Sequence, residues 1–209
     1  MVKSYWRAVL PIGVLALAGC SAMNRSECQV SDWRAVGFED GAKGASVARI
    51  GEYRKACSKY QVAPDLEAYR AGYAEGVSSY CREANGFNVG SRGVVYQGIC
   101  PAESEEGFLT GYRSGFHLYE LNVAVDSLSG QIASKHQSLH QLKEQLDEKK
   151  ASLLDKNTPD SERALLASDI YNLGRQRGKL ENEIEALQRE LGARQEELAR
   201  YRESLALNR

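Results

Sequence analysis

Hydrophobic residues recur at alternating steps of four and three along the C-terminal half of the chain. The first run of such positions extends from Leu121 to Leu153, and the second from Leu166 to Leu205. A period of 3.5 residues sustained over this length is typical of a coiled coil. Residues 155–161 interrupt the period. The pattern therefore predicts two long helices over residues 121–207 with a turn at 155–161, where Thr158 is suited to cap a helix and Pro159 to its first turn.

These two helices can pair with each other as an antiparallel hairpin, or each can join helices of other chains. We favour the hairpin because its partner is already tethered nearby, and further self-association stays open. Folded about the turn, the seam pairs Leu146 with Ile170, Ile132 with Ile184 and Val125 with Leu191. Lys135 interrupts the apolar seam and is expected near Glu181. Residues 198–205 should extend back and dock on residues 108–119.

The composition changes near residue 120. Thirteen of the nineteen glycines lie between Gly37 and Gly115, and all four phenylalanines and eight of the eleven tyrosines lie in nearly the same stretch. We therefore expect a small disulfide-containing Gly/aromatic domain over residues 28–120, ahead of the hairpin. The fold class is mainly α, a disulfide-stapled helical domain followed by a long antiparallel coiled coil.

A Gly-aromatic-x-x-Gly motif occurs within this domain, in copies that begin at Gly37, Gly72 and Gly111. Glycines four residues apart share one face of a helix and permit a second backbone to approach closely. Each glycine in a helix costs up to about 1 kcal/mol relative to alanine, so the packing must offset this loss. The motif predicts tight contact among three short helices.

Four cysteines lie in the same region: Cys28, Cys57, Cys81 and Cys100. An even number in an exported domain indicates two disulfides. A four-thiolate zinc site is the alternative, but such sites usually contain closely spaced pairs, and these gaps are 29, 24 and 19 residues. Four cysteines allow three pairings. We favour Cys28–Cys57 with Cys81–Cys100, because each would close a local loop.

Residues 82–99, between the last two cysteines, are rich in glycine and asparagine. This composition argues against a regular helix and favours turns, with a possible short strand at 94–96. The segment is a candidate binding loop, and its candidate contact residues are Arg82, Asn85, Asn88, Arg92 and Tyr96. The alternative is a structural loop packed on its own Phe87 and Tyr96.

Residues 1–19 have the features of a bacterial signal peptide. Lys3 and Arg7 precede a short apolar run, which ends in Leu17-Ala18-Gly19-Cys20. The run is too short to span a bilayer, which needs about 20 residues. The tetrapeptide resembles the bacterial lipobox and implies a lipid on Cys20, followed by a short linker over 20–27. An ordinary signal peptide with a chance cysteine is the alternative. By the same resemblance, Ser21 in place of aspartate implies sorting to the outer membrane, facing the periplasm, with surface exposure left open.

An ordered pattern of cysteines, glycines and aromatic residues extends over residues 28–121. Its positions are Asp32, Trp33, Gly37, Asp40, Gly41, Gly44, Tyr53, Cys57, Tyr69, Gly72, Gly76, Tyr80, Cys81, Gly90, Gly93, Tyr96, Gly98, Cys100, Pro101 and residues 108–119. This pattern resembles the family of small proteobacterial lipoproteins catalogued as domain of unknown function 2799. The resemblance implies an envelope setting and brings no known activity.

Few residues suit catalysis or metal binding. The formal charge is −1, with 27 basic and 28 acidic residues mixed along the chain, so no basic surface favours nucleic acid. His136 and His140 are four residues apart and supply only two metal ligands, so we expect no metal site. Carboxylate pairs such as Asp147-Glu148 and Glu196-Glu197 are typical of a solvated helix. No phosphate-binding loop or nucleophile motif is present, so no cofactor is expected.

We therefore expect a non-enzymatic envelope protein, tethered to the membrane through Cys20, that presents its coiled coil to another envelope protein or to itself. A small-ligand or glycan-binding module using loop 82–99 is the alternative, and a cell-wall hydrolase is a remote one.

Replacement of Cys20 by serine tests the anchor. Because the thiol is the acylation site, Cys20→Ser should leave an uncleaved precursor without lipid, detected by metabolic labelling with palmitate. A mutant that is processed normally and stays membrane-bound would contradict the lipid anchor.

Overall fold

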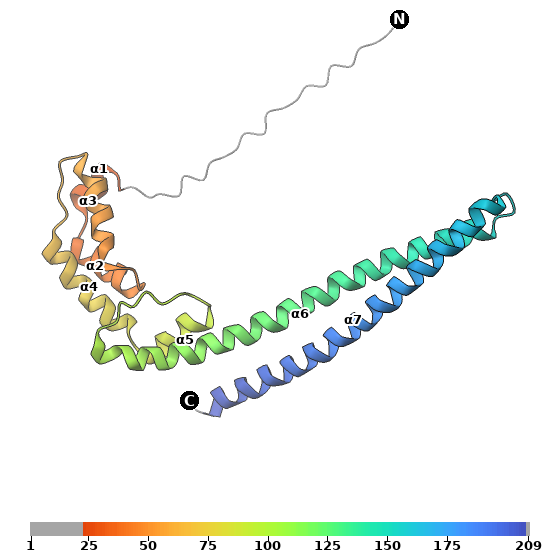
Figure 1. The fold of residues 1–209 in the computed structure, drawn as a ribbon. Helices are drawn as coiled ribbons and strands as arrows, with labels where there is room; N and C mark the ends of the chain where they lie inside the picture. Colours follow the sequence, from red (N-terminus) through yellow and green to blue (C-terminus); the bar gives the residue numbers. More distant parts are fainter. Residues whose placement is uncertain (1–22, 208–209) are drawn as a thin grey trace, which may run out of the picture.

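The computed structural model describes residues 23–207, and the predicted signal peptide and Cys20 lie outside this range. Within it the fold is helical, and residues 23–207 contain no strand. The helices are α1 (Arg25–Val30), α2 (Trp33–Ala42), α3 (Ile50–Ser58), α4 (Leu66–Tyr80), α5 (Glu83–Ser91), α6 (Ala102–Leu154) and α7 (Asp160–Leu207), with a 3-10 turn at Val47–Arg49. The first five helices and the start of α6 form a small body, from which α6 and α7 extend as a long hairpin (Figure 1).

The body is built from two pairs of helices in backbone contact. In the first pair, α2 packs on α4 through the motifs that begin at Gly37 and Gly72. A Cβ atom added to Gly37 would overlap the carbonyl oxygen of Tyr69, and one added to Gly72 would overlap that of Arg34. Gly41 lies against Tyr73 and Val77, farther along α4. Because residue numbers rise together on both helices, the pair runs parallel.

The second pair joins α5 to the start of α6 in the same way. Gly111 and Gly115 of α6 lie against the backbone of Glu83 and Phe87 in α5. The α5 side of the contact is a fourth Gly-aromatic-x-x-Gly motif, Gly86 to Gly90. The prediction of three helices in mutual contact was therefore wrong. The motif occurs four times and forms two separate parallel pairs.

The two pairs share further equivalent positions. In the second helix of each pair, the residue three places before the first glycine of the motif has a fully buried aromatic ring, Tyr69 before Gly72 and Phe108 before Gly111. Two residues after the end of each first helix lies a glycine with positive φ, Gly44 after α2 and Gly93 after α5. In both, the N–H of the next residue donates to a carbonyl five residues earlier and so closes the helix end. The body is thus one helix-pair unit used twice.

The expectation that residues 82–99 exclude a regular helix was wrong, since α5 occupies half of this segment. Its two glycines are tolerated because they face α6, where close backbone contact offsets their low helix propensity. The possible strand at 94–96 was also wrong, because these residues form part of an irregular connection that returns the chain to the start of α6.

Each unit contains one disulfide and one small core. The bonds are Cys28–Cys57 and Cys81–Cys100, the pairing favoured from the sequence. Cys28 and Cys57 are buried with Trp33 and Tyr69, whereas the second disulfide is buried with Val77, Tyr80, Val89 and Phe108. Tyr73 packs against both cores and so connects the two units.

No helix boundary separates the body from the hairpin. Helix α6 is continuous over 53 residues, so the third motif, at Gly111, and the first arm of the coiled coil lie on one helix. Helix α7 returns antiparallel to it. The hairpin turn lies at the opposite end of the molecule from α1 and α3 (Figure 1).

Substitution of a contact glycine tests the parallel packing. In Gly72→Ala the new methyl group would overlap the Arg34 carbonyl, so the helices must separate, at a cost of about 2–3 kcal/mol in the free energy of unfolding. Gly178→Ala is the matched control: this α7 glycine has open space around it and should gain up to about 1 kcal/mol. Equal effects in urea denaturation would contradict the contact.

Candidate functional site

The hairpin turn is held by one arginine. The Arg163 guanidinium donates from Nε to the Thr158 carbonyl at 3.0 Å, from Nη1 to the Leu153 carbonyl at 3.0 Å and from Nη2 to the Asp155 carbonyl at 2.7 Å. The Thr158 hydroxyl donates to the Ser152 carbonyl at 2.7 Å. Thr158 therefore caps the end of α6, and the prediction that it caps the next helix was wrong. Helix α7 begins at Asp160, inside the predicted turn.

Two ion pairs connect the arms. Lys135 Nζ lies 2.6 Å from Glu183 Oε2, and Lys149 Nζ lies 2.6 Å from Asp169 Oδ2. The expected partner of Lys135 was Glu181, and this was wrong by two residues. Glu181 instead lies 3.5 Å from Arg177 on its own helix. The hydrogen bond from Lys135 lowers the pKa of Glu183. In both ion pairs the two residue numbers average 159, whereas in the predicted layers they average 158. The observed ion pairs therefore lie close to the predicted register.

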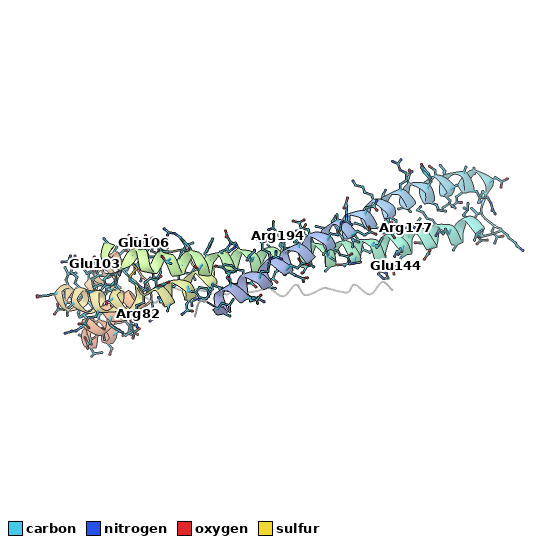
Figure 2. The ribbon with its side chains drawn as sticks, turned by 90° about the horizontal axis from the view of Figure 1, so that it is seen from below. Arg82, Glu103, Glu106, Glu144, Arg177 and Arg194 are labelled. Carbon is cyan, nitrogen blue, oxygen red and sulfur yellow. A yellow bond between two sulfur atoms is a disulfide. The ribbon has the colours of Figure 1, made fainter. Side chains whose placement is uncertain are left out.

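The seam between the arms is partly open. Its buried members are Leu121, Leu128, Leu139, Leu146, Leu166, Ile184 and Leu198, and most of the other seam positions are half-buried. Arg177 and Arg194 occupy seam positions but are exposed, and each pairs with a glutamate of its own helix. Viewed from below, α7 crosses from one side of α6 to the other along the hairpin, with these arginines among its charged side chains (Figure 2).

The end of α7 docks on the body as predicted. The Tyr201 hydroxyl donates to the Ser114 carbonyl at 2.8 Å, and the Tyr201 ring packs edge-on against the His117 ring at 4.7 Å between centroids. Arg202 donates to the Asn122 side chain at 2.8 Å. Because Ser114 lies between Gly111 and Gly115, α7 contacts α6 at the same turn that packs on α5.

The outward faces of the two arms differ in charge. From Leu121 to Leu142, α6 contains only two ionisable residues other than histidine, Asp126 and Lys135, and Lys135 is paired with α7. Over a similar length α7 carries charges at nearly every other position. One row of exposed α6 residues with the spacing of the seam contains only serine and glutamine, and we call it the Ser/Gln row: Ser127, Gln131, Ser134, Ser138, Gln141 and Gln145.

Three of the candidate loop residues hydrogen-bond to backbone carbonyls nearby in the chain. Asn85 Nδ2 donates to the Tyr80 carbonyl at 2.8 Å, Arg82 Nε to the Ser79 carbonyl at 3.0 Å, and Arg92 Nε to the Asn88 carbonyl at 3.1 Å. Arg82, Asn85 and Asn88 border a shallow cavity of about 300 Å³, which Arg92 and Tyr96 do not reach.

Tyr96 has a structural position. Its hydroxyl accepts the Cys100 backbone N–H at 2.8 Å and donates to Glu105 at 3.1 Å, while its ring packs on Phe108. Burial raises the pKa of the Tyr96 hydroxyl. The contacts of this residue fix the connection ahead of α6.

A buried carboxylate lies in the first unit, and sequence reasoning did not single it out as a polar centre. Asp40 is 4 % exposed; it accepts hydrogen bonds from the hydroxyls of Tyr69 at 2.9 Å and Tyr53 at 3.3 Å, and Arg49 Nη1 lies 3.7 Å away. Burial and the neighbouring Asp40 raise the pKa of Tyr69. No buried side-chain polar atom of this group lacks a hydrogen-bond partner, and the cluster connects α2, α3 and α4. In the sequence, the only sign of this cluster is the position of Asp40 inside the glycine motif that begins at Gly37.

The three histidines are exposed on α6. His117 lies 3.7 Å from Glu120, and His140 lies 3.4 Å from Glu144. Among residues 23–207 no group of three potential ligands gathers in a way that could hold a metal ion. None of the described helices has both the length and the apolar character needed to cross a bilayer.

Comparison with known proteins matches residues 32–117 to the family described as protein of unknown function, DUF2799. The match confirms, over these residues, the resemblance to this family that was stated from the sequence. The matched segment extends from the start of α2 to residue 117 of α6, where the end of α7 docks. It includes all four glycine motifs. Neither the curated proteins nor the solved structures contain a match to the chain.

A cysteine pair tests the register of the hairpin. Cysteines at positions 146 and 170 should form a disulfide within one chain at any protein concentration, because a disulfide needs Cα atoms within about 7 Å. Cysteines at 146 and 171 are the matched control, since Tyr171 is exposed. Non-reducing electrophoresis of the denatured protein measures the bond. Links that form only between chains would contradict the hairpin.

Proposed function

We propose that this chain is a non-enzymatic, lipid-anchored protein of the bacterial outer membrane that presents the α6 face of its hairpin to a protein partner. The anchor is the predicted lipid on Cys20, and Ser21 supports outer-membrane sorting. The observation that carries the proposal is the Ser/Gln row, an exposed and uncharged face on one arm of a rod whose other arm is densely charged.

Surfaces that become the buried centre of an interface are depleted in charged residues, because the charges would lose their hydration. An exposed rod has no such constraint, and α7 shows the charge density typical of one. The Ser/Gln row contains no charged residue that would lose its hydration in an interface, over a stretch of about 18 residues, or roughly 27 Å at 1.5 Å per residue. Serine and glutamine can still hydrogen-bond in water, so the free protein keeps this face solvated. A partner helix lying along the row could exchange those bonds.

The glycan-binding alternative has less support. Arg82, Asn85 and Arg92 hydrogen-bond to nearby residues of the chain, and Tyr96 holds Cys100 and Glu105. The remaining candidate, Asn88, also borders a cavity of about 640 Å³ between α5, α6 and the end of α7, where Phe87 and Leu205 supply apolar walls. That cavity presents one carboxylate, Glu83, and no cation for an acidic sugar.

Site-specific photo-cross-linking in cells tests the proposal. A photoreactive amino acid at Ser134, in the middle of the row, should give a discrete adduct with one partner, identified by mass spectrometry. The same amino acid at Ala186, an exposed residue of α7, is the matched control and should give none. Adducts at both positions, or at neither, would contradict the proposal, and adducts with a second copy would identify the row as an assembly surface.

A charge substitution adds a readout that does not depend on cross-linking. Ser134→Lys with Ser138→Lys should abolish the adduct formed from a probe at Gln131, because two cations would be buried without partners. The free energy of unfolding should change by less than about 0.5 kcal/mol, as both side chains are exposed. Persistence of the adduct would contradict recognition through the row.

A further inference from the structure

Basic residues gather in one part of the first unit. Residues 43–63 contain five of the chain's 27 basic residues and only one of its 28 acidic residues. This segment contains the 3-10 turn, α3 and the turn that follows it. Three of its cations, Arg54, Lys55 and Lys59, have no ion-pair partner within the described residues.

The acidic residues around them are engaged elsewhere. Glu27, Asp32 and Asp65 accept hydrogen bonds at helix N-termini. Asp40 is buried against tyrosine hydroxyls, with Arg49 beside it. Glu52, the one acidic residue of the segment, offsets only one of its five cations, so residues 43–63 keep an excess of positive charge on the surface of the unit.

The free cations lie on a surface that also has polar and aromatic groups. Arg54, Lys55 and Ser58 follow one face of α3 and line a cavity of about 540 Å³ together with Gln61 and Val62. Beside it, Lys59 Nζ lies 4.8 Å and the Arg25 guanidinium 5.5 Å from the centre of the Tyr60 ring. We call Arg25, Arg54, Lys55 and Lys59 the basic patch.

The patch lies close to where the chain enters the body. Met23, the first described residue, packs on the core around Cys28 and Cys57. Arg25 lies five residues after Cys20, so even a fully extended chain places these two residues within about 18 Å of each other. If Cys20 carries the anchor, the patch must lie near the bilayer surface. The hairpin turn is at the far end of the molecule (Figure 1).

We propose that the basic patch docks on the anionic phospholipid headgroups of the membrane that holds the anchor. This inference rests on the proposed function for its location, and on the free cations for its chemistry. Arginine binds a phosphate through two parallel N–H bonds, lysine acts as a mobile point charge, and a half-exposed tyrosine is the residue type favoured at the membrane interface. Docking would orient the body and point the hairpin away from the bilayer.

The test uses the chain from Ser21 onward, without lipid, which includes all described residues. It should co-sediment with vesicles of phosphatidylglycerol and phosphatidylcholine in equal parts, and not with phosphatidylcholine alone. Binding should weaken as salt is added, because screening shortens the reach of exposed charges. In the variant Arg54→Gln, Lys55→Gln, Lys59→Gln, binding should fall by about fivefold per charge removed.

A matched control removes the same number of charges from the hairpin. Lys143, Lys156 and Arg175 are exposed and make no ion pair within residues 23–207, so their triple glutamine variant should bind the vesicles like the parent. Circular dichroism checks that both variants fold. Absence of vesicle binding, or equal loss in both variants, would overturn the proposal.

A competition arm separates a membrane surface from a small-anion site. Glycerol phosphate, at the phosphate concentration of the vesicles and at constant ionic strength, should not displace the protein. Full displacement would overturn docking and indicate a site for a free phosphate compound. Because this chain lacks Cys20, failure of the test leaves the lipid anchor and the hairpin function standing, and their own tests remain independent.

Discussion

Direct contact between the backbones of parallel helices is the constraint on which the body of this protein depends. Eight glycines form these contacts, four in each pair, and an added methyl group at any of them would overlap a carbonyl of the facing helix. At this distance Cα–H groups face carbonyl oxygens, and side chains contribute little to the contact itself. Apolar side chains pack beside the glycine contacts, where the rings of Tyr69 and Phe108 are fully buried.

Parallel pairing also dictates the connections. Two consecutive helices that run in the same direction need a chain segment that returns to the starting end. Residues 43–65 serve this purpose between α2 and α4, and residues 92–101 between α5 and α6. Neither return segment has a core of its own. The disulfides Cys28–Cys57 and Cys81–Cys100 tie each unit together at its connection, with the Asp40 cluster and Tyr96 adding polar ties.

The parts of this architecture that could be predicted are those in which one local rule dominates. The coiled coil follows from its period, and the disulfides from the number and spacing of four cysteines. Helix α5 was missed because its glycines were counted as turn formers, although a facing helix compensates for them. The same error concealed the motif at Gly86. The expected partner of Lys135 was two residues from the observed one, because the prediction paired residues about position 158 and the observed ion pairs are centred on position 159.

The candidate sites show a similar division. Within residues 23–207, the cations of the basic patch are unpaired because nearby acidic residues cap helices or lie in the core. The sequence alone does not show which acidic residues have these roles. The Ser/Gln row is visible in the sequence once the seam is known, because its spacing copies that of the seam. Its exposure could not be inferred until α7 was placed against the seam positions of α6.

The unbroken course of α6 gives the molecule the mechanics of a lever. A helix of 53 residues is about 80 Å long at 1.5 Å per residue, and it enters the body without a joint. A load applied at the hairpin turn would therefore be transmitted as torque to the part of α6 around Ser114, where α5 packs against the helix and the Tyr201 hydroxyl donates to the Ser114 carbonyl. The body and the hairpin would therefore tilt together, so an interaction that fixes the orientation of the body also sets the direction in which the hairpin turn points.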